Sequence, residues 1–273
     1  MPDLYAIITE VAPEVQERLA GVLELRAADP QQQAMLRAYV SDVEFPRAAR
    51  VLEVGCGTGA VTRTLARWPS VTEVVGIDPS LFFLSKAREL GRGLMNMSFE
   101  VADGRSLPFE NQTFDVVVYH TTLCHLPGPE RALAEGFRVI RPGGWAAIFD
   151  GDYATTTVAA GDSDPLQACA DAAIAGLVHD RWLIRRLPML VRSAGFEVVR
   201  VRSHGYLETS EPSYMLTLID RGADFLVSSG RIGAEFAATL KAEARRRAQS
   251  HEFFGHIAYF SLIGRRPLQR TRG

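Results

Sequence analysis

The sequence predicts an α/β protein built on a doubly wound, mostly parallel sheet of seven strands, with helices on both faces and a helical cap insertion. Short apolar runs bounded by glycine, proline or aspartate alternate with segments of helical periodicity, an order typical of a parallel sheet. The chain has 273 residues, of which 47% are hydrophobic and 23% charged, so it can bury a full core.

The predicted elements follow one another regularly along the chain. The expected strands are residues 50–54, 71–77, 97–101, 114–119, 145–149, 196–203 and 256–263. The expected helices are residues 11–28, 31–43, 60–67, 80–90, 129–140, 166–177 and 184–193, with two more, 212–228 and 232–249, inside a long insertion. Residues 151–164 are rich in Ala, Thr, Gly and Asp and are predicted to form a loop.

This order divides the chain into four parts. Residues 1–45 are expected to form N-terminal helices that act as a partial lid, and residues 46–207 the core. Residues 208–255 are long for a simple connection, so we expect them to cap a pocket. Residues 256–273 are predicted to be the last strand and a basic tail, frayed from Arg265 onwards.

Charge and cysteine content argue against several classes of protein. A formal net charge of -2 provides no positive field for nucleic acid or an anionic membrane. Cys56, Cys124 and Cys169 lie far apart and form no CxxC pair, which argues against a disulfide scaffold or a zinc site. The first residues carry no basic region and no apolar run reaches 18 residues. We expect a cytoplasmic monomer or homodimer that acts on a small molecule.

A glycine-rich turn directly after the first predicted strand is the most informative motif. Gly55, Gly57 and Gly59 alternate there, and glycine both tolerates the tight turn and lets backbone N–H groups approach a ligand. Ala60 completes the spacing Gly-x-Gly-x-x-Ala, so the same string also satisfies the dinucleotide fingerprint. The motif alone leaves both cofactor classes open.

Two acidic residues bear on the choice between a dinucleotide and S-adenosylmethionine. Glu53 stands two residues before Gly55, where a fixed negative charge would repel a pyrophosphate and favour the ammonium and sulfonium of S-adenosylmethionine. Asp78 ends the second predicted strand, 23 residues beyond Gly55, where a carboxylate can accept both ribose hydroxyls. Because either cofactor would use Asp78, only Glu53 discriminates between them.

Five motifs in order then produce a resemblance over residues 45–150. They read VLEVGCGTG, GIDPS, VADGRSLPF, FDVVVYHTTLCHL and RVIRPGGWAAIF. In this order the chain resembles the class I S-adenosylmethionine-dependent methyltransferases, in particular the subgroup related to the ubiquinone and menaquinone biosynthesis enzymes. The resemblance implies a Rossmann-like fold, S-adenosylmethionine as cofactor, and methyl transfer to a small organic metabolite through an O, N or C acceptor.

The resemblance also implies a set of cofactor contacts. Asp103 corresponds to the acid that accepts the exocyclic amine of adenine, and Ser80 and Leu81, with Pro79, would wall the ring. The implied cofactor-binding residues are Glu53, Gly55, Cys56, Gly57, Gly59, Asp78, Pro79, Asp103, Gly104 and His120. Cys56 is the variable residue between two of these glycines.

Two histidines are candidates for catalysis. His120 follows the fourth predicted strand and His125 comes five residues later, so both are expected at the carboxyl edge of the sheet, where open α/β sheets place ligands. Either can serve as a general base, because the unperturbed pKa of imidazole lies near neutral pH. The alternative for each is a packing and hydrogen-bonding role.

Substrate contacts are predicted at Tyr5, His125, Asp152 and Tyr153. Asp150 and Asp152 are expected to end the fifth strand, where they would bind substrate or, with a histidine, a divalent metal, and for Asp152 a turn-forming role is an equal alternative. A metal site is not expected, because metal-dependent relatives carry an acid at the end of the fourth strand and this chain has Tyr119 and His120 there.

Further wall candidates have no motif behind them, and a structural role is favoured for each. They are Tyr39, Arg181, Trp182, Arg185 and Arg186. The apolar side chains of the insertion, namely Tyr214, Met215, Leu216, Leu218, Phe225 and Leu226, favour an apolar or aromatic substrate, with core packing or a dimer interface as an equal alternative. The rival functions are an NAD-dependent oxidoreductase and an S-adenosylmethionine-binding protein that does not methylate.

Overall fold

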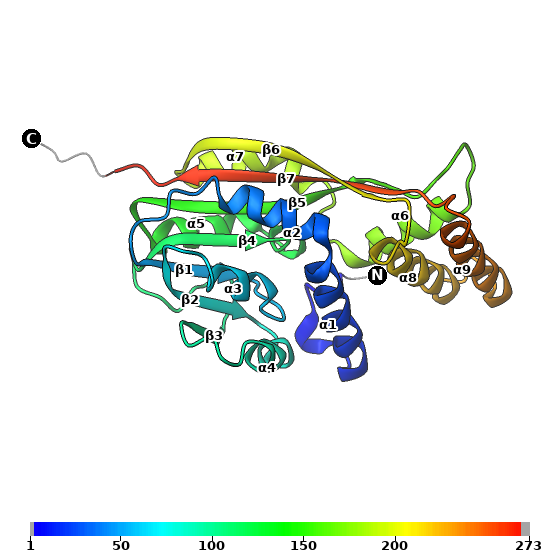
Figure 1. Ribbon diagram of the computed structural model, residues 1–273, viewed down its shortest axis with the longest axis horizontal. Coiled ribbons are helices and arrows are strands. Elements are labelled where there is room, and N and C mark those ends of the chain that lie inside the picture. Colours follow the sequence, from blue (N-terminus) through cyan, green and yellow to red (C-terminus); the bar gives the residue numbers. More distant parts are fainter. Residues whose placement is uncertain (1–2, 269–273) are drawn as a thin grey trace, which may run out of the picture.

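The computed structural model describes residues 3–268 and confirms the seven-stranded α/β fold (Figure 1). The strands are β1 (Ala49–Val54), β2 (Val71–Asp78), β3 (Met97–Val101), β4 (Phe114–His120), β5 (Ile140–Thr157), β6 (Glu197–Glu208) and β7 (Gly255–Arg265). Their order in the sheet is β3-β2-β1-β4-β5-β7-β6. β7 is antiparallel to both of its neighbours, and the other pairs are parallel. The order reverses between β1 and β4, which is where such sheets open a ligand crevice.

Helices cover both faces of this sheet. In chain order they are α1 (Pro13–Ala28), α2 (Pro30–Val40), α3 (Ala60–Leu65), α4 (Leu81–Leu90), α5 (Pro129–Val139), α6 (Leu166–Leu177), α7 (Leu183–Ser193), α8 (Tyr214–Ser228) and α9 (Ala234–Gln249), with short 3-10 helices η1 (Ile8–Glu10) and η2 (Leu123–His125). α2 lies over one face, while α5 and α7 lie over the other (Figure 1).

Helix starts follow local chemistry. Asp29 caps α2, because its Oδ1 accepts the backbone N–H of Gln32 at 2.9 Å, and Ser80 caps α4 through the N–H of Phe83 at 3.2 Å. α1, α2 and α5 each carry proline in the first turn, where no helical hydrogen bond is lost.

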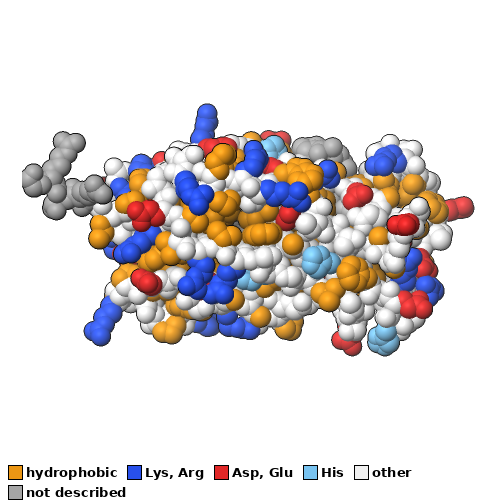
Figure 2. Space-filling model, turned by 90° about the horizontal axis from the view of Figure 1, so that it is seen from above, with side chains coloured by type: hydrophobic (Ala, Val, Ile, Leu, Met, Phe, Trp, Pro, Cys, Tyr) orange, Lys and Arg blue, Asp and Glu red, His pale blue; other side chains and the backbone are white. Residues whose placement is uncertain are grey.

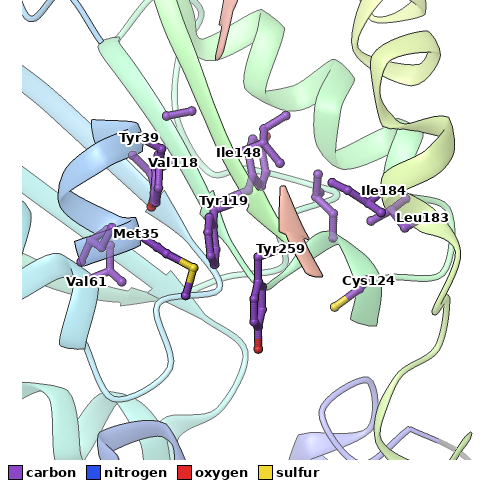
Figure 3. Packing of buried hydrophobic residues seen from close by; sticks show 14 of the residues in the cluster. Met35, Tyr39, Val61, Val118, Tyr119, Cys124, Ile148, Leu183, Ile184 and Tyr259 are labelled. Carbon is purple, nitrogen blue, oxygen red and sulfur yellow. The ribbon is translucent and has the colours of Figure 1, made fainter. Parts of the chain in front are cut away.

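The central strands are buried on both faces, so they are almost continuously apolar. Val118 and Tyr119 of β4 and Ile148 of β5 join Tyr39 of α2 and Tyr259 of β7 in one cluster, which Figure 3 shows from close by. This cluster holds the sheet's carboxyl edge in place next to the crevice.

The prediction of a loop over residues 151–164 is wrong for its first half. β5 continues through residues 151–157 of the expected loop, because β7 pairs with it as far as Thr157, which lies opposite His256. The pairing supplies the hydrogen bonds that these small and polar residues need, so composition alone was misleading. Asp150 and Asp152 therefore lie inside the strand and do not end it.

The insertion forms the helices α8 and α9, which pack with α6 at the end of the molecule where β5, β6 and β7 project (Figure 1). α8 approaches α6 closely at Gly222, where a Cβ would stand 1.7 Å from the carbonyl oxygen of Cys169. None of the helices within residues 3–268 has the length and hydrophobicity that a bilayer crossing requires.

The tail predicted from Arg265 is ordered at its start. Arg266 exchanges backbone hydrogen bonds with residues 143 and 144, and its Nη1 donates to the carbonyl oxygens of Phe137 and Ile140, both at 2.6 Å. Residues 269–273 of the predicted tail lie outside the described residues.

Edge strand β6 is exposed along much of its length, and Figure 2 shows apolar and basic side chains mixed on that side of the molecule. Val199 and Val201 are 52% and 48% exposed. Arg200 and Arg202 both pair with Asp42, at 2.7 and 2.6 Å. Charged side chains on an edge strand oppose pairing with another chain.

Candidate cofactor and substrate site

The glycine loop between β1 and α3 requires its glycines. Gly55, Gly57 and Gly59 have φ angles of 71°, 52° and 76°, in the left-handed region that favours glycine. A Cβ on Gly55 would stand 2.4 Å from the Cγ2 of Thr122. The turn and its packing against Thr122 therefore require glycine, and Gly55 and Gly57 line the cavity.

Asp78, at the end of β2, ties this loop to the start of α4. Its Oδ2 accepts the N–H of Gly57 and its Oδ1 the N–H of Ser80, each at 2.9 Å. Burial raises the pKa of the Asp78 carboxyl to about 6. Each oxygen keeps further lone pairs, and the residue lines the cavity, so the carboxylate can also accept hydroxyl groups of a ligand.

Glu53 is more deeply buried than its predicted role suggested, with 2% of the residue exposed. Its Oε2 accepts a hydrogen bond from the hydroxyl of Thr62. Burial, reinforced by the charge of Asp78 and opposed by the Thr62 hydrogen bond, raises the pKa of the Glu53 carboxyl to about 8. The expectation of a fixed negative charge is therefore corrected: Glu53 is mostly protonated at neutral pH until a cation favours its ionised form.

Asp103 follows β3 and lies at the cavity wall. Arg105 pairs with it, the Nη2–Oδ2 distance being 2.6 Å and the Nε–Oδ1 distance 3.0 Å. The Arg105 hydrogen bonds hold the pKa of the Asp103 carboxyl below its usual value. Arg105, two residues along the chain, was not among the predicted site residues.

His120, at the end of β4, is held by aromatic neighbours. Its Nδ1 lies 3.0 Å from the Oη of Tyr39, and its ring stacks on Phe149 with centroids 4.8 Å apart. Burial, with the nearby charge of Arg26, lowers the pKa of His120 to about 3. The ring is neutral at physiological pH and is a weak proton acceptor.

His125, at the end of η2, pairs with a residue 122 positions away. Its Nδ1 lies 2.7 Å from the Oδ2 of Asp3, and its ring lies against Tyr5 with centroids 4.8 Å apart. Asp3 also accepts the N–H groups of Tyr5 at 2.9 Å and His179 at 2.8 Å. This carboxylate therefore holds the N-terminal segment over the carboxyl edge of the sheet, and no local signal in the sequence marks it.

These groups surround one cavity of about 500 Å³. Eleven of the predicted site residues line it, namely Tyr5, Glu53, Gly55, Cys56, Gly57, Asp78, Pro79, Asp103, Gly104, His120 and His125. The predicted residues that do not line it are Tyr39, Gly59, Ser80, Leu81, Asp150, Asp152, Tyr153, Arg181, Trp182, Arg185 and Arg186. The cavity wall also contains no residue of 208–255.

The substrate contacts predicted at Asp152 and Tyr153 need correction. The Oδ2 of Asp152 instead pairs with the Nε of Arg185 at 2.9 Å, across to α7. Tyr153 is 4% exposed and packs edge-on against Tyr259, with centroids 6.3 Å apart. Both residues lie within β5 because that strand is longer than predicted, so their side chains are directed by its pairing with β7.

Sequence reasoning also missed residues from the two leading helices that line the cavity. They include Leu23 and Arg26 of α1 and Gln32, Leu36 and Arg37 of α2. The helical periodicity of both segments was visible, but which helix face meets the crevice depends on how α1 and α2 pack.

The residues present fit S-adenosylmethionine. Gly55 and Gly57 of the glycine loop line the cavity, as do Glu53 of β1, Asp78 at the end of β2 and Asp103 just after β3. Carboxylates in these places are able to accept hydrogen bonds from an amine and from hydroxyls and to attract a cation, which are the groups that this cofactor carries. Within residues 3–268 no three His, Cys, Asp or Glu side chains are grouped as a metal would require. The site thus defines a Rossmann-like protein that binds a cationic nucleoside.

Comparison with known proteins agrees with a site for S-adenosylmethionine. A family model described as a methyltransferase domain matches residues 52–148. An uncharacterized methyltransferase of Schizosaccharomyces pombe is 37% identical over 117 residues, which are 40% of this chain and 42% of that protein. The 2-phytyl-1,4-naphtoquinone methyltransferase of Thermosynechococcus vestitus is 31% identical over 158 residues, 58% of this chain and 68% of that enzyme.

A candidate methyltransferase from Bacillus halodurans has a similar solved structure, with a TM-score of 0.62 at 19% identity, covering 85% of this chain and 98% of that chain. The present chain spans less than half the length of the first curated relatives that it matches. It belongs to the class I S-adenosylmethionine-dependent methyltransferases, and S-adenosylmethionine is the cofactor for which its site is built.

Proposed function

We propose that this protein transfers the methyl group of S-adenosylmethionine to a small organic metabolite. The observation that carries the proposal is the acid-lined glycine cradle, which continues into one cavity with the N-terminal helices. In this proposal Asp103 binds adenine, Asp78 the ribose, and Glu53 with Gly55 the ammonium end. When bound, the cofactor supplies an activated methyl on a sulfonium, which the acceptor attacks in line.

The chain's own residues then position the acceptor and exclude water. Tyr5 and Ile8 from the N-terminal segment, with Leu23 and Leu36 from α1 and α2, would cover the acceptor and close the crevice. Holding the acceptor in line with the methyl converts a bimolecular reaction into a nearly unimolecular one, which is a large part of catalysis in many enzymes.

His125 is the better candidate for removing a proton from the acceptor. Asp3 holds its Nδ1 at 2.7 Å, which orients the ring and leaves Nε2 for the substrate. His120 is a poorer base, because its pKa is lowered to about 3, and we assign it a positioning role through its hydrogen bond with Tyr39. Two further parts of the proposal come from the sequence: the protein is a cytoplasmic monomer or homodimer, and residues 46–207 form its core. The predicted cap, residues 208–255, contributes no residue to the cavity wall and is left out of the proposal.

Calorimetric titration with S-adenosylhomocysteine tests the proposal. We expect the wild-type protein to bind it and Asp78→Ala to bind at least about tenfold more weakly, since hydroxyl contacts to a buried carboxylate are lost. Asp224→Ala is the matched control, because Asp224 lies on α8 and is 63% exposed in its side chain. Unchanged affinity in Asp78→Ala would contradict the assignment.

A second measurement separates the rival functions. We expect S-adenosylhomocysteine, and not NAD, to raise the melting temperature of the wild-type protein. Tritiated methyl from the cofactor should then appear in product when a panel of phenols, quinols and carboxylic acids is supplied. A rise with NAD alone would favour an oxidoreductase, and binding without transfer to any member would favour the non-methylating alternative.

A further inference from the structure

The cavity contains a cation that the cofactor site does not explain. Arg26 lies in the last turn of α1 and lines the cavity, yet its side chain forms no hydrogen bond or ion pair within residues 3–268. Its guanidinium lies over the ring of Tyr214, 5.4 Å from the centroid. Its principal electrostatic neighbours are the tyrosines 5, 153, 214 and 259, so no carboxylate balances its charge.

Two further polar side chains in this part of the molecule are unpaired: Gln32, which lines the same cavity, and Tyr259, which is an electrostatic neighbour of Arg26. Gln32 is 5% exposed, and neither the nitrogen nor the oxygen of its side-chain amide has a partner. The hydroxyl of Tyr259 is likewise buried without a partner, next to Gln32 but outside hydrogen-bonding geometry. Buried polar groups in native proteins are almost always paired. Side chains from α1, α2 and β7 in this part of the molecule thus have polar atoms without a protein partner.

These groups lie on the far side of β4 from the cofactor residues. Glu53, Asp78 and Asp103 stand at the ends of β1, β2 and β3. Most of the groups that Arg26 influences lie instead on β4, β5, β7 and α8, including His120, and the others are Tyr5 in the N-terminal segment and Cys124 in η2. Because the sheet order is β3-β2-β1-β4-β5-β7-β6, this is the half of the crevice left for the methyl acceptor.

We propose that Arg26 and Gln32 form an oxyanion subsite, which binds a carboxylate carried by the methyl acceptor. The inference rests on the proposed function and narrows its substrate to an organic acid. A guanidinium presents a planar set of N–H donors that matches a carboxylate, and the Gln32 amide adds donors beside it. The apolar wall residues suit the body of such an acid. The proposed substrate is therefore an apolar or aromatic molecule, as predicted from the sequence, that also carries a carboxylate.

The partial negative charge at the end of α1 and the Tyr214 ring stabilise the guanidinium in part. Neither gives the Gln32 amide or the Tyr259 hydroxyl a partner. A carboxylate in the crevice would accept hydrogen bonds from both Arg26 and Gln32, which line it, whereas a purely structural role for Arg26 leaves Gln32 unpaired.

The cofactor has a carboxylate of its own, for which the cavity offers a second guanidinium. Arg37 of α2 also lines the cavity and is exposed. The third arginine of the wall, Arg105, is paired with Asp103. One cofactor carboxylate therefore leaves either Arg26 or Arg37 for another anion, and Arg26 is the more buried of the two.

The test uses protein saturated with S-adenosylhomocysteine, titrated calorimetrically with benzoate and with benzamide, its neutral analogue of the same shape. We expect the wild-type protein to prefer benzoate by about tenfold or more. Arg26→Met keeps the length of the side chain and should lose this preference, while its affinity for S-adenosylhomocysteine stays within about threefold. Arg231→Met is the matched control, because Arg231 is exposed and lies outside the cavity wall, and it should keep the preference.

A second variant guards against a folding defect in the first. Gln32→Glu places a carboxylate beside Arg26, so it should abolish benzoate binding while the protein still binds S-adenosylhomocysteine. Equal binding of benzoate and benzamide, or a preference that survives Arg26→Met, would overturn the inference. Loss of S-adenosylhomocysteine affinity in Arg26→Met would also overturn it, by assigning Arg26 to the cofactor carboxylate. Failure of the wild-type protein to bind S-adenosylhomocysteine would instead overturn the proposed function.

Discussion

Cofactor binding should be coupled to the loss of a proton from Glu53. Its carboxyl has a pKa of about 8 in the protein alone, so at pH 7 about nine-tenths of the molecules carry the proton. A bound cation favours the ionised form, and the apparent affinity then follows the ionised fraction. That fraction rises from about 1% at pH 6 to about 50% at pH 8, so affinity for S-adenosylmethionine should rise by a factor of about 50.

Calorimetry in buffers of different ionisation enthalpy measures this coupling. At pH 7 we expect close to one proton to be released per cofactor bound, and Glu53→Gln should release far less. Asp78, whose pKa is about 6, adds a smaller dependence of the affinity on pH, and the Glu53→Gln variant retains this smaller dependence. An affinity that is flat from pH 6 to pH 8, or an equal slope in Glu53→Gln, would refute the reasoning.

The same shift has a consequence for stability. Because folding raises the pKa of Glu53 from 4.5 to about 8, its protonated form stabilises the fold below pH 4.5, and this contribution is lost as pH rises toward 8. Over that window the wild-type protein should lose up to about 4 kcal/mol relative to Glu53→Gln. Urea unfolding at pH 5 and pH 8 measures the difference, and a gap between the two proteins that does not change with pH would contradict it.

Two further predictions concern the packing of α8 on α6 and the anchoring of the N-terminal segment. Gly222→Ala should lower the free energy of unfolding by about 1–3 kcal/mol in urea titrations, since the new Cβ would collide with the backbone of α6, whereas Gly233→Ala, with nothing within 4 Å, should be nearly neutral. Equal effects would argue against the close packing of α8 on α6. Asp3→Ala should speed amide hydrogen exchange at Tyr5 and His179 about tenfold or more, because both N–H groups lose their carboxylate acceptor. Unchanged exchange would show that other contacts hold the N-terminal segment.

The sequence by itself determined the elements whose signals are local. Periodicity located the helices and the buried strands to within a few residues, and the glycine loop with Glu53 and Asp78 indicated the cofactor, because turn conformation and helix periodicity depend on neighbours along the chain. The prediction of a loop at residues 151–157 was wrong because the structure there depends on residues distant in sequence. Strand β5 is completed at this point by hydrogen bonds from β7, about a hundred residues away.

Only the tertiary structure decided the chemistry of the substrate side. Asp3 reaches His125 across 122 positions, and Arg26 and Gln32 become unpaired donors only once α1 and α2 pack over the crevice. The charge of Glu53 is also a tertiary property, because burial changes its pKa and burial cannot be read from the residue's neighbours in sequence. Hydrogen bonds and desolvation depend on which groups meet in space, and that information appears only with the assembled fold.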